Sequence, residues 1–560
     1  MVDLQMKNKK NSWLILGIVG LVFVVIGAYL WTTSLMDSAQ TYRSPLSNTP
    51  PLPGQRLGTP ITHRVVIVLV DALRFDTSTN TTIMPTLSLL RSQGASATMH
   101  SQPPSFSAPA WTTILTGAWP EINDSQPFNP PDENSARAFT QDDIFAAVHR
   151  AGLHTAVSGY IWFEKMLSNS GVNEGFYTSG EDNAADIEVI NAAVSWLGDD
   201  HQLILIHLDQ VDFAGHEQGG PQDPNWNAAA NRVDTMINNI VSILDFSQDT
   251  LLVISDHGQI DRGGHGGPEP ITLLEPFILT GAGIIPGNYG DINMVDIAPT
   301  LAVLLGTNIP ASSQGSPLLN MLSLSPDRVS SINNAIELQQ ARLFSSYTAA
   351  IGSASSIGNG ETVLATQSAI NQAHLARVAK ERIWRNVLAV FLAILPAYVI
   401  YLRKDKKVIW LFAGSFLYVL LFNIRYAVID GRTYSLASVE GATWLIAYTA
   451  STAAIAGVLG WLVPMTALKV LPGNPRKSAE TVVAYIWSTI YFLSLPILLS
   501  FAINGLTVTW TLPEFYSMYI GLLSLIQVML LSVVGLVLTG IMVLISWFIG
   551  KLRPGPLSMD

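Results

Sequence analysis

Three apolar runs in the sequence are each followed by aspartate or histidine. The runs are VVIVLV at 65–70, LILIHL at 203–208 and LLVIS at 251–255. Six polar side chains come after them in order: Asp71 directly after the first run, Asp212 and His216 shortly after the second, and Asp256, His257 and, within GGHGG, His265 after the third. Carboxylates combined with neutral imidazoles suit zinc, and less specifically manganese or iron. The pattern therefore predicts a metal centre.

Each of these signals has a commoner explanation when it stands alone. An aspartate after a strand usually caps a helix or closes a turn, and a histidine in a glycine-rich loop is usually solvated. Asp212 and His216 are four residues apart, which brings both to one side of a helix but also occurs by chance. The metal hypothesis depends on all of the signals occurring in this order, each beyond an apolar run.

The segment PPSFSAPAWTTILTG at 103–117 supplies the candidates for a nucleophile. A hydroxyl held against zinc can lose its proton at neutral pH, because the metal lowers its pKa. Spacing alone does not choose among the hydroxyls, most of which also suit the capping of a helix that we expect to begin near Ala108–Pro109. The candidates are Ser105, Ser107, Thr112, Thr113 and Thr116.

The apolar runs also predict the fold of the region 62–322. Continuous runs rich in β-branched residues suit strands that are buried on both faces, and they alternate here with helical stretches such as 136–151 and 225–244. We expect an α/β domain with a mainly parallel sheet sandwiched by helices. In such sheets the ligand site lies beyond the carboxyl ends of the strands, which is where the six polar residues fall.

The composition indicates that much of the remaining chain lies in a membrane. Hydrophobic residues make up 49% of the chain and charged residues only 13%. The apolar excess forms six candidate spans: 13–31, and segments near 387–402, 408–424, 441–465, 482–503 and 519–549. A cleaved signal peptide is the alternative for the first, but its apolar core is usually only about 7–15 residues long.

Basic residues predict the orientation of these spans. They cluster at 403–407, at 469–477 and after the last span, so both termini are expected in the cytoplasm and the region 62–322 outside it. The expected segments are a cytoplasmic N-terminus (1–12), a transmembrane anchor (13–36), a linker (37–61), an extracytoplasmic catalytic domain (62–322), a helical stalk (323–385), five transmembrane helices (386–551) and a cytoplasmic tail (552–560).

Charge and cysteine content narrow the chemistry further. Acidic residues outnumber basic ones several-fold within 62–322. A field of that sign repels phosphate backbones, so we expect no nucleic-acid partner. The chain has no cysteine, which excludes disulfides and thiolate metal sites.

Several separated motifs resemble the alkaline phosphatase superfamily. The similarity is to type I phosphodiesterase/nucleotide pyrophosphatase domains and, most closely, to the ethanolamine phosphate transferases of GPI-anchor assembly. The motifs are DALRFD at 71–76, the nucleophile segment at 107–117, HLDQVDFAGH at 207–216, SDHG at 255–258, GGHGG at 263–267, FILTGAGI at 277–284 and VDIAPTLAVLLGTNIP at 295–310. The resemblance covers essentially all of 62–322, and it implies an alkaline-phosphatase-like fold beside the six-helix transmembrane part.

The resemblance also implies a site with two zinc ions, with manganese as the alternative metal. One ion would be held by Asp71, Ser107, Asp256 and His257, and the other by Asp212, His216 and His265. Ser107 would be the nucleophile, and Asn129 would bind a phosphate oxygen. Arg74 follows the first ligand closely and is a candidate for substrate binding, with a structural salt bridge to Asp76 as the alternative reading.

The implied chemistry is phosphodiester cleavage in two displacements through a phospho-serine. Attack by a lipid or glycan hydroxyl would make the enzyme a transferase, which would take a phosphoethanolamine-like group from a membrane lipid. Attack by water would make it an exported phosphodiesterase or pyrophosphatase, and the segment SAPAWTTILTG has the phosphodiesterase form. A catalytically dead membrane scaffold would have lost ligands, and none is missing. A transporter would carry more charges within its spans.

Overall fold

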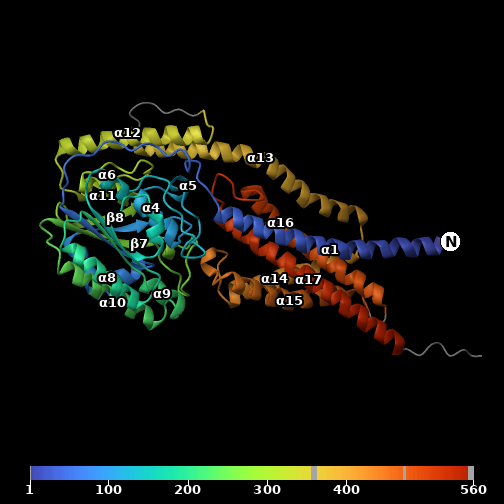
Figure 1. The fold of residues 1–560 in the computed structure, drawn as a ribbon. Coiled ribbons are helices and arrows are strands. Elements are labelled where there is room, and N and C mark those ends of the chain that lie inside the picture. Colours follow the sequence, from blue (N-terminus) through green and yellow to red (C-terminus); the bar gives the residue numbers. More distant parts are fainter. Residues whose placement is uncertain (1, 355–361, 471–473, 553–560) are drawn as a thin grey trace, which may run out of the picture. The chain divides into compact units, whose positions relative to one another are not determined.

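A computed structural model describes residues 2–354, 362–470 and 474–552 of the chain (Figure 1). The chain divides into two compact units. One comprises Met1–Ser38, Glu381–Val508 and Pro513–Asp560, and the other comprises Ala39–Lys380 and Thr509–Leu512. The second unit contains the sheet and all of the candidate site residues, and we call it the sheet unit.

The sheet unit is built around eight strands in the order β4-β3-β5-β1-β6-β7-β2-β8. The strands are β1 (Arg64–Val70), β2 (Ala95–His100), β3 (Thr155–Tyr160), β4 (Glu174–Thr178), β5 (Leu203–Leu208), β6 (Asp249–Ile254), β7 (Leu274–Gly281) and β8 (Gly287–Asn293). The five strands from β4 to β6 run parallel, and β7 runs antiparallel to both of its neighbours. The mainly parallel sheet expected from the apolar runs is confirmed, with β7 as the exception.

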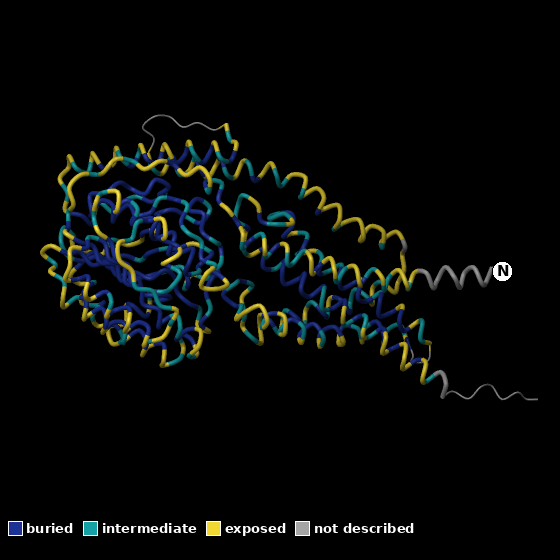
Figure 2. The backbone as a smooth tube through the Cα atoms, viewed as in Figure 1, coloured by how far each residue is buried: buried dark blue, intermediate teal, exposed yellow. Residues whose placement is uncertain are grey.

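Helices cover both faces of the sheet, as Figures 1 and 2 show. Alternate residues of β1 point to opposite sides: Val66 and Val68 belong to one buried hydrophobic cluster, Val65 and Ile67 belong to another, and helices contribute to both clusters. Every residue of β1 is buried, which explains why this strand has no polar alternation. The predicted α/β sandwich is therefore correct.

The helices of the sheet unit differ from the expected ranges mainly at their ends. They are α2 (Phe75–Ser78), α3 (Pro85–Gln93), α4 (Ser107–Thr116), α5 (Pro120–Asn123), α6 (Ile144–Arg150), α7 (Trp162–Met166), α8 (Asn183–Leu197), α9 (Gln210–Glu217), α10 (Pro224–Val241), α11 (Ile297–Leu305) and α12 (Pro326–Ala350). The helix expected over 136–151 begins only at Ile144, because the Asp143 side chain accepts a hydrogen bond from the Ala146 N–H and caps it there.

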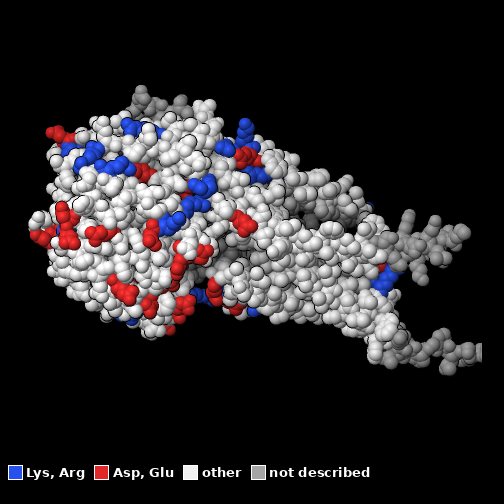
Figure 3. Space-filling model, in the orientation of Figure 1, with Lys and Arg blue, Asp and Glu red and all other residues white. Residues whose placement is uncertain are grey.

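The other unit consists of long apolar helices. They are α1 (Val2–Gln40), α13 (Val363–Arg403), α14 (Lys407–Asn423), α15 (Ala442–Ala467), α16 (Pro475–Asn504) and α17 (Phe515–Leu552), and the ends of α1 and α13 extend into the sheet unit. Six helices in the described parts of the chain are long and apolar enough to cross a membrane. On the face shown in Figure 3, charged side chains are sparse over these helices. The expectation of an integral membrane protein with six spans is confirmed.

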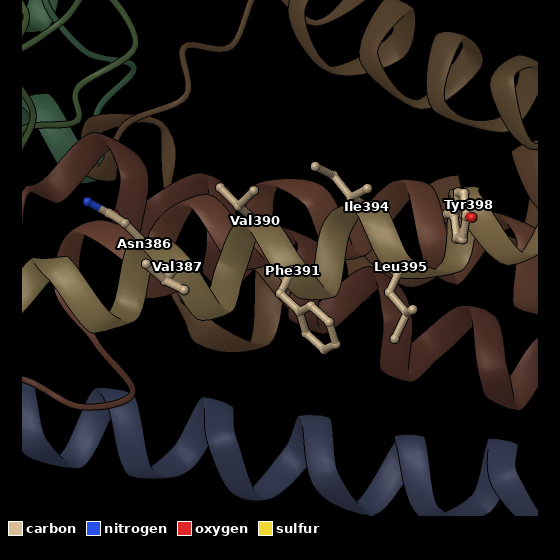
Figure 4. Close-up of a pocket in the computed structure, with 7 residues that line it drawn as sticks. All are labelled: Asn386, Val387, Val390, Phe391, Ile394, Leu395 and Tyr398. Carbon is tan, nitrogen blue, oxygen red and sulfur yellow. The ribbon is translucent and has the colours of Figure 1, made fainter.

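Helix α13 joins two segments that the sequence suggested were separate. Residues 363–385 of the expected stalk continue without a break into the span that was expected from 387, because no glycine or proline interrupts the run before Pro396. The span carries an apolar hollow of about 570 Å³, lined by Asn386, Val387, Val390, Phe391, Ile394, Leu395 and Tyr398 (Figure 4). Such a surface suits contact with acyl chains. The expected tail at 552–560 lies outside the described residues except for residue 552.

Candidate metal centre and nucleophile

The first group of candidate ligands lies at the ends of β1 and β6. Asp71 follows β1 directly, and Asp256 and His257 follow β6 after one serine. All three are buried, and one possible ligand atom from each lies within 4.8 Å of the others. His257 Nε2 is 3.5 Å from Asp71 Oδ1 and 3.7 Å from Asp256 Oδ2. Because β1 and β6 are adjacent parallel strands, their carboxyl ends bring these side chains to one place.

Neighbouring groups fix the two carboxylates in position. His207 Nε2 hydrogen-bonds Asp71 Oδ2 at 3.0 Å, and Trp111 Nε1 donates to Asp256 Oδ2 at 2.7 Å. The backbone N–H of Ala72 donates to Asp256 Oδ1 at 3.1 Å. Ala72 has a φ of 58°, a left-handed conformation that is uncommon for residues other than glycine. The turn after β1 is thus held in a strained conformation that turns its N–H toward Asp256.

The second group of candidate ligands lies on α9 and on the glycine-rich loop. Asp212 and His216 both belong to α9, which begins almost directly after β5. His216 Nε2 is 3.5 Å from Asp212 Oδ2 and 3.0 Å from His265 Nε2. His265 Nε2 lies 3.7 Å from Asp212 Oδ1, to which the Gln259 amide also donates. The expectation that a helix brings Asp212 and His216 to one point is confirmed.

The two groups adjoin through a pair of histidines. The rings of His257 and His265 stack with centroids 4.0 Å apart and an interplanar angle of 15°. Possible ligand atoms of both also lie within 4.8 Å of one from Asp212. The loop that carries His265 turns back on itself at Gly263 and Gly266, whose φ values of 87° and 94° lie in the region that favours glycine. All six polar residues singled out from the sequence therefore meet beyond the carboxyl ends of the central strands.

Ser107 is the hydroxyl that faces this cluster. It is the first residue of α4, it is buried, and its Oγ lies 3.2 Å from His257 Nε2. The first amides of a helix have no partner within the helix, and together with the helix dipole they favour an anion at this position. The Ser107 hydroxyl therefore lies at a helix start that favours an anion and beside the candidate metal ligands.

The other four hydroxyls bond to the backbone. Thr112, Thr113 and Thr116 each donate to the carbonyl four residues earlier in α4, at 2.6–2.8 Å. Ser105 Oγ donates to the Gly267 carbonyl at 3.1 Å and accepts from the Gly266 N–H at 2.9 Å, so it holds the glycine-rich loop. Ser107 is thus the one of the five hydroxyls that contacts a candidate metal ligand, and its role as the nucleophile stays a prediction.

The two candidate substrate-binding residues are placed differently. Asn129 lies beside Ser107: its Oδ1 accepts from the Ala108 N–H at 3.1 Å, and its Nδ2 is 3.5 Å from Ser107 Oγ. Arg74 is buried in ion pairs with Asp76 at 2.5 Å and with Asp261 at 2.7 Å. This geometry corresponds to the structural salt bridge weighed as the alternative for Arg74, and a role in substrate binding stays a prediction.

Burial and like charges set the protonation of the cluster. Burial, and then the charges of Asp256 and Asp212, raise the pKa of Asp71 well above its usual range. Burial raises the pKa of Asp256 to about 6 and lowers the pKa of His257 to about 4 and of His265 to about 3. Both imidazoles are therefore neutral at neutral pH and have a lone pair to offer to a metal ion.

The donor set fits metal binding. Asp71 Oδ1 is buried and has no hydrogen-bond partner among the described residues. His216 and His265 direct ring nitrogens at each other across 3.0 Å. A cation that accepts the free lone pairs accounts for both observations, and carboxylate with neutral imidazole is a donor set that zinc accepts.

Three supporting residues were not singled out from the sequence. His207 holds Asp71, Trp111 holds Asp256, and Gln259 holds Asp212. His207 had a weak signal, since it is the one polar residue inside the apolar run LILIHL. Trp111 and Gln259 had none, because their partners are about 145 and 47 residues away in the sequence.

Comparison with known families agrees with this site. Residues 65–265, which contain every candidate ligand and Ser107, match the family described as type I phosphodiesterase / nucleotide pyrophosphatase. Residues 65–265 of the sheet unit are thus similar to this family, which agrees with the resemblance to type I phosphodiesterase/nucleotide pyrophosphatase domains drawn from the motifs. The superfamily resemblance drawn from the motifs is confirmed.

Particular relatives point in the same direction. GPI ethanolamine phosphate transferase 2 of Candida albicans is 24% identical over 48% of this chain and 33% of its own length. The catalytic subunit of human GPI ethanolamine phosphate transferase 2 is 26% identical over 48% of this chain and 29% of its own length. The chain therefore matches only about a third of these relatives. Among solved structures, the alkaline phosphatase PafA gives a TM-score of 0.37 at 12% identity, covering 47% of this chain and all of its own.

Proposed function

We propose that this chain is a membrane-bound two-zinc enzyme that transfers a phosphoethanolamine-like group from a membrane phospholipid to a hydroxyl of a lipid or glycan. The observation that carries the proposal is the position of Ser107 Oγ, 3.2 Å from His257 at the start of α4 and beside the converging carboxylates. Similarity to GPI ethanolamine phosphate transferases supports the choice of the transferred group. Six apolar helices support a donor that resides in the membrane.

The residues divide into two ligand sets. Asp71, Ser107, Asp256 and His257 would hold one ion, and Asp212, His216 and His265 the other. Bound zinc would lower the pKa of the Ser107 hydroxyl and offset charge on the phosphoryl oxygens.

The transfer would take place in two displacements at Ser107. In the first, Ser107 Oγ bonds to phosphorus while the bond from phosphorus to the glycerol oxygen breaks, and that oxygen takes up the proton lost by Ser107. In the second, the oxygen of the acceptor hydroxyl bonds to phosphorus, the Oγ–phosphorus bond breaks, and Ser107 takes up the proton that the acceptor hydroxyl loses. Asn129 Nδ2, which lies 3.5 Å from Ser107 Oγ, and the backbone N–H of Ser107 at the start of α4 would donate to the phosphoryl oxygens. Basic clusters at 403–407 and 469–477 support a catalytic domain that faces away from the cytoplasm.

The experiment is product analysis with the full-length protein in liposomes. Phosphatidylethanolamine labelled in its ethanolamine is supplied with and without a glycan-bearing lipid acceptor. We expect the label on the acceptor, with one diacylglycerol released per transfer. Ser107→Ala should abolish both products. Ser195→Ala, on an exposed residue of α8 that bonds only within its own helix, is the matched control.

Other outcomes would revise the proposal in specific ways. Free phosphoethanolamine in the presence of acceptor would make the enzyme a hydrolase, which is the reading that the phosphodiesterase family match favours. Absence of diacylglycerol would remove this lipid as the donor. Continued turnover by Ser107→Ala, with no phosphorylated serine found after acid quench, would refute the covalent route.

A further inference from the structure

Three further polar residues lie at strand ends beside the metal cluster. Tyr160 is the last residue of β3, Asp209 directly follows β5, and Glu181 comes three residues after β4. The strand order β4-β3-β5-β1 makes these three ends consecutive neighbours of the strand end that carries Asp71. None of the three belongs to the proposed ligand sets or acts as the nucleophile, so their function needs a separate explanation.

Asp209 is a buried carboxylate without a donor. The residue is only 9% exposed, and no hydrogen bond reaches its side chain from residues 2–354, 362–470 or 474–552. Its backbone N–H is used, since it donates to Asp186 Oδ1 at 2.8 Å. One carboxylate oxygen of Asp209 lies within 4.8 Å of an oxygen of Asp71 and a nitrogen of His207, so the group points toward the site. The Asp209 oxygens are not among the fully buried atoms without a partner, so a positively charged ligand that enters the site can reach them.

The surroundings of Asp209 supply no such charge from the protein. The charged groups that act on it most strongly are all carboxylates: Asp212, Asp186, Glu181 and Asp256. Glu181, on the exposed rim, accepts a hydrogen bond from the Tyr160 hydroxyl at 3.1 Å. No lysine or arginine is among the strongest influences on Asp209 or Glu181, and the basic group that acts on Glu181 is His216. The proposed ions already have three carboxylate ligands, so two carboxylates remain for another cation.

We propose that Asp209 and Glu181, with the ring of Tyr160, form a subsite for the ammonium group of a zwitterionic phosphodiester headgroup. The inference rests on the proposed function and adds the residues that would select the substrate. In an aminoethyl phosphate, two carbons separate the ester oxygen from the amine. Adjacent strands lie about 4.8 Å apart, so a phosphoryl group at Ser107 would leave the amine within reach of the neighbouring strand ends. Carboxylates and an aromatic face are the groups that bind an alkylammonium ion.

A metal ion is the rival occupant. Asp71, His207 and Asp209 lie close enough together to hold one. Against this reading, the Nε2 atom of His207 is already engaged with Asp71 at 3.0 Å. The two readings differ in what the loss of the Asp209 charge would do, because a metal ligand changes the metal content whereas an ammonium subsite changes only the choice of substrate.

The test compares two substrates that differ only at the amine. The zinc-loaded, full-length protein is given p-nitrophenyl phosphoethanolamine and p-nitrophenyl propyl phosphate, in which a methyl group replaces the ammonium. We expect kcat/KM to favour the aminoethyl ester by about tenfold or more, because hydrogen bonds to charged groups are worth that factor. Asp209→Asn and Glu181→Gln should each reduce that preference by about tenfold. Glu188→Gln, which removes an exposed charge from α8, should keep it.

Each outcome decides between the explanations. Equal kcat/KM values for the two esters in the wild-type protein, or a preference that survives both substitutions, would overturn the subsite while leaving phosphodiester cleavage intact. Zinc loss in Asp209→Asn, measured by elemental analysis, would assign Asp209 to a metal ion instead. Failure of the wild-type protein to cleave either ester would count against the proposed function itself, and the subsite would fall with it. Should Asp209→Asn fail to fold, Glu181→Gln on the exposed rim decides alone.

Discussion

The hydrogen bond from Trp111 to Asp256 should measurably strengthen metal binding. Trp111 Nε1 donates at 2.7 Å to Oδ2 of a fully buried carboxylate whose other oxygen accepts from the Ala72 and His257 backbone amides at 3.1 and 3.0 Å. These three bonds fix the plane of the carboxylate. Trp111→Phe would remove one of them while keeping an aromatic ring against Phe163, whose ring is stacked on the indole at 4.3 Å.

The expected magnitude follows from the charge of the acceptor. A hydrogen bond to a charged group contributes about 1.5–3 kcal/mol, and the loss of a partner that orients a metal ligand typically weakens metal binding about 10- to 100-fold. The smaller ring would also leave a cavity, which should lower the free energy of unfolding by about 1–3 kcal/mol. We therefore expect zinc affinity to fall by one to two orders of magnitude in a protein that remains folded.

Trp162 provides the matched control for this experiment. Its ring lies 5.9 Å from that of Trp111, and its Nε1 is buried without a hydrogen-bond partner among the described residues. Trp162→Phe thus removes an indole N–H that holds no ligand. Zinc affinity is measured for both variants by competition with a chromophoric chelator, alongside thermal unfolding. Equal zinc affinities in the two variants would refute the reasoning, since the difference between them is the bond to Asp256.

Three further predictions concern metal content, topology and pH. Asp212→Ala combined with His216→Ala should lower the zinc content from about two ions per chain to about one by elemental analysis, and unchanged content would remove both from the ligand set. Single cysteines introduced into this cysteine-free chain should be labelled only from the cytoplasm in the loop 403–407 and only from the other side at Gly180, and the reverse result would overturn the orientation. Burial raises the pKa of Asp143 to about 7. The folded chain then keeps a proton that the unfolded chain loses above about pH 4. The free energy of unfolding should therefore fall by at most about 4 kcal/mol as the pH rises from about 4 to 7. Asp143→Asn should flatten that fall, as measured by thermal unfolding at each pH.

The sequence predicted the position of the cluster because strand burial and strand polarity are local properties. A run such as VVIVLV has no polar residue to face solvent, so it must form a central strand of the sheet. The first polar residue after it must then lie at the carboxyl end of that strand. β1, β5 and β6 proved to be adjacent and parallel, so Asp71, Asp212 and Asp256 were brought together by strand order alone.

The contacts around the cluster could not be predicted in the same way. The antiparallel β7 and the delayed start of α6 depend on pairings and caps that apolar periodicity does not encode. Ser107 and Thr112 can be told apart only by the directions of their side chains. Those directions depend on where α4 begins and on where His257 lies. Likewise, His207 is as buried as the apolar residues around it, so composition conceals its bond to Asp71.

The turn between β5 and α9 connects metal binding with the proposed binding of the substrate amine. It carries Asp209 and Asp212 three residues apart, and both depend on the same buried anchor, Asp186. The Asp186 carboxylate accepts from the Asp209 and Gln210 backbone amides at 2.8 and 3.3 Å, and from the Gln210 side chain at 2.8 Å. Asp186 lies on α8, and α8 also packs against β3 and β4. The same helix therefore positions the turn that starts α9 and the strand ends near Tyr160 and Glu181. A displacement of α8 would therefore shift the proposed amine subsite and Asp212, a proposed ligand of the second ion, together. A single helix would thus position both the phosphoryl group and the amine of the substrate.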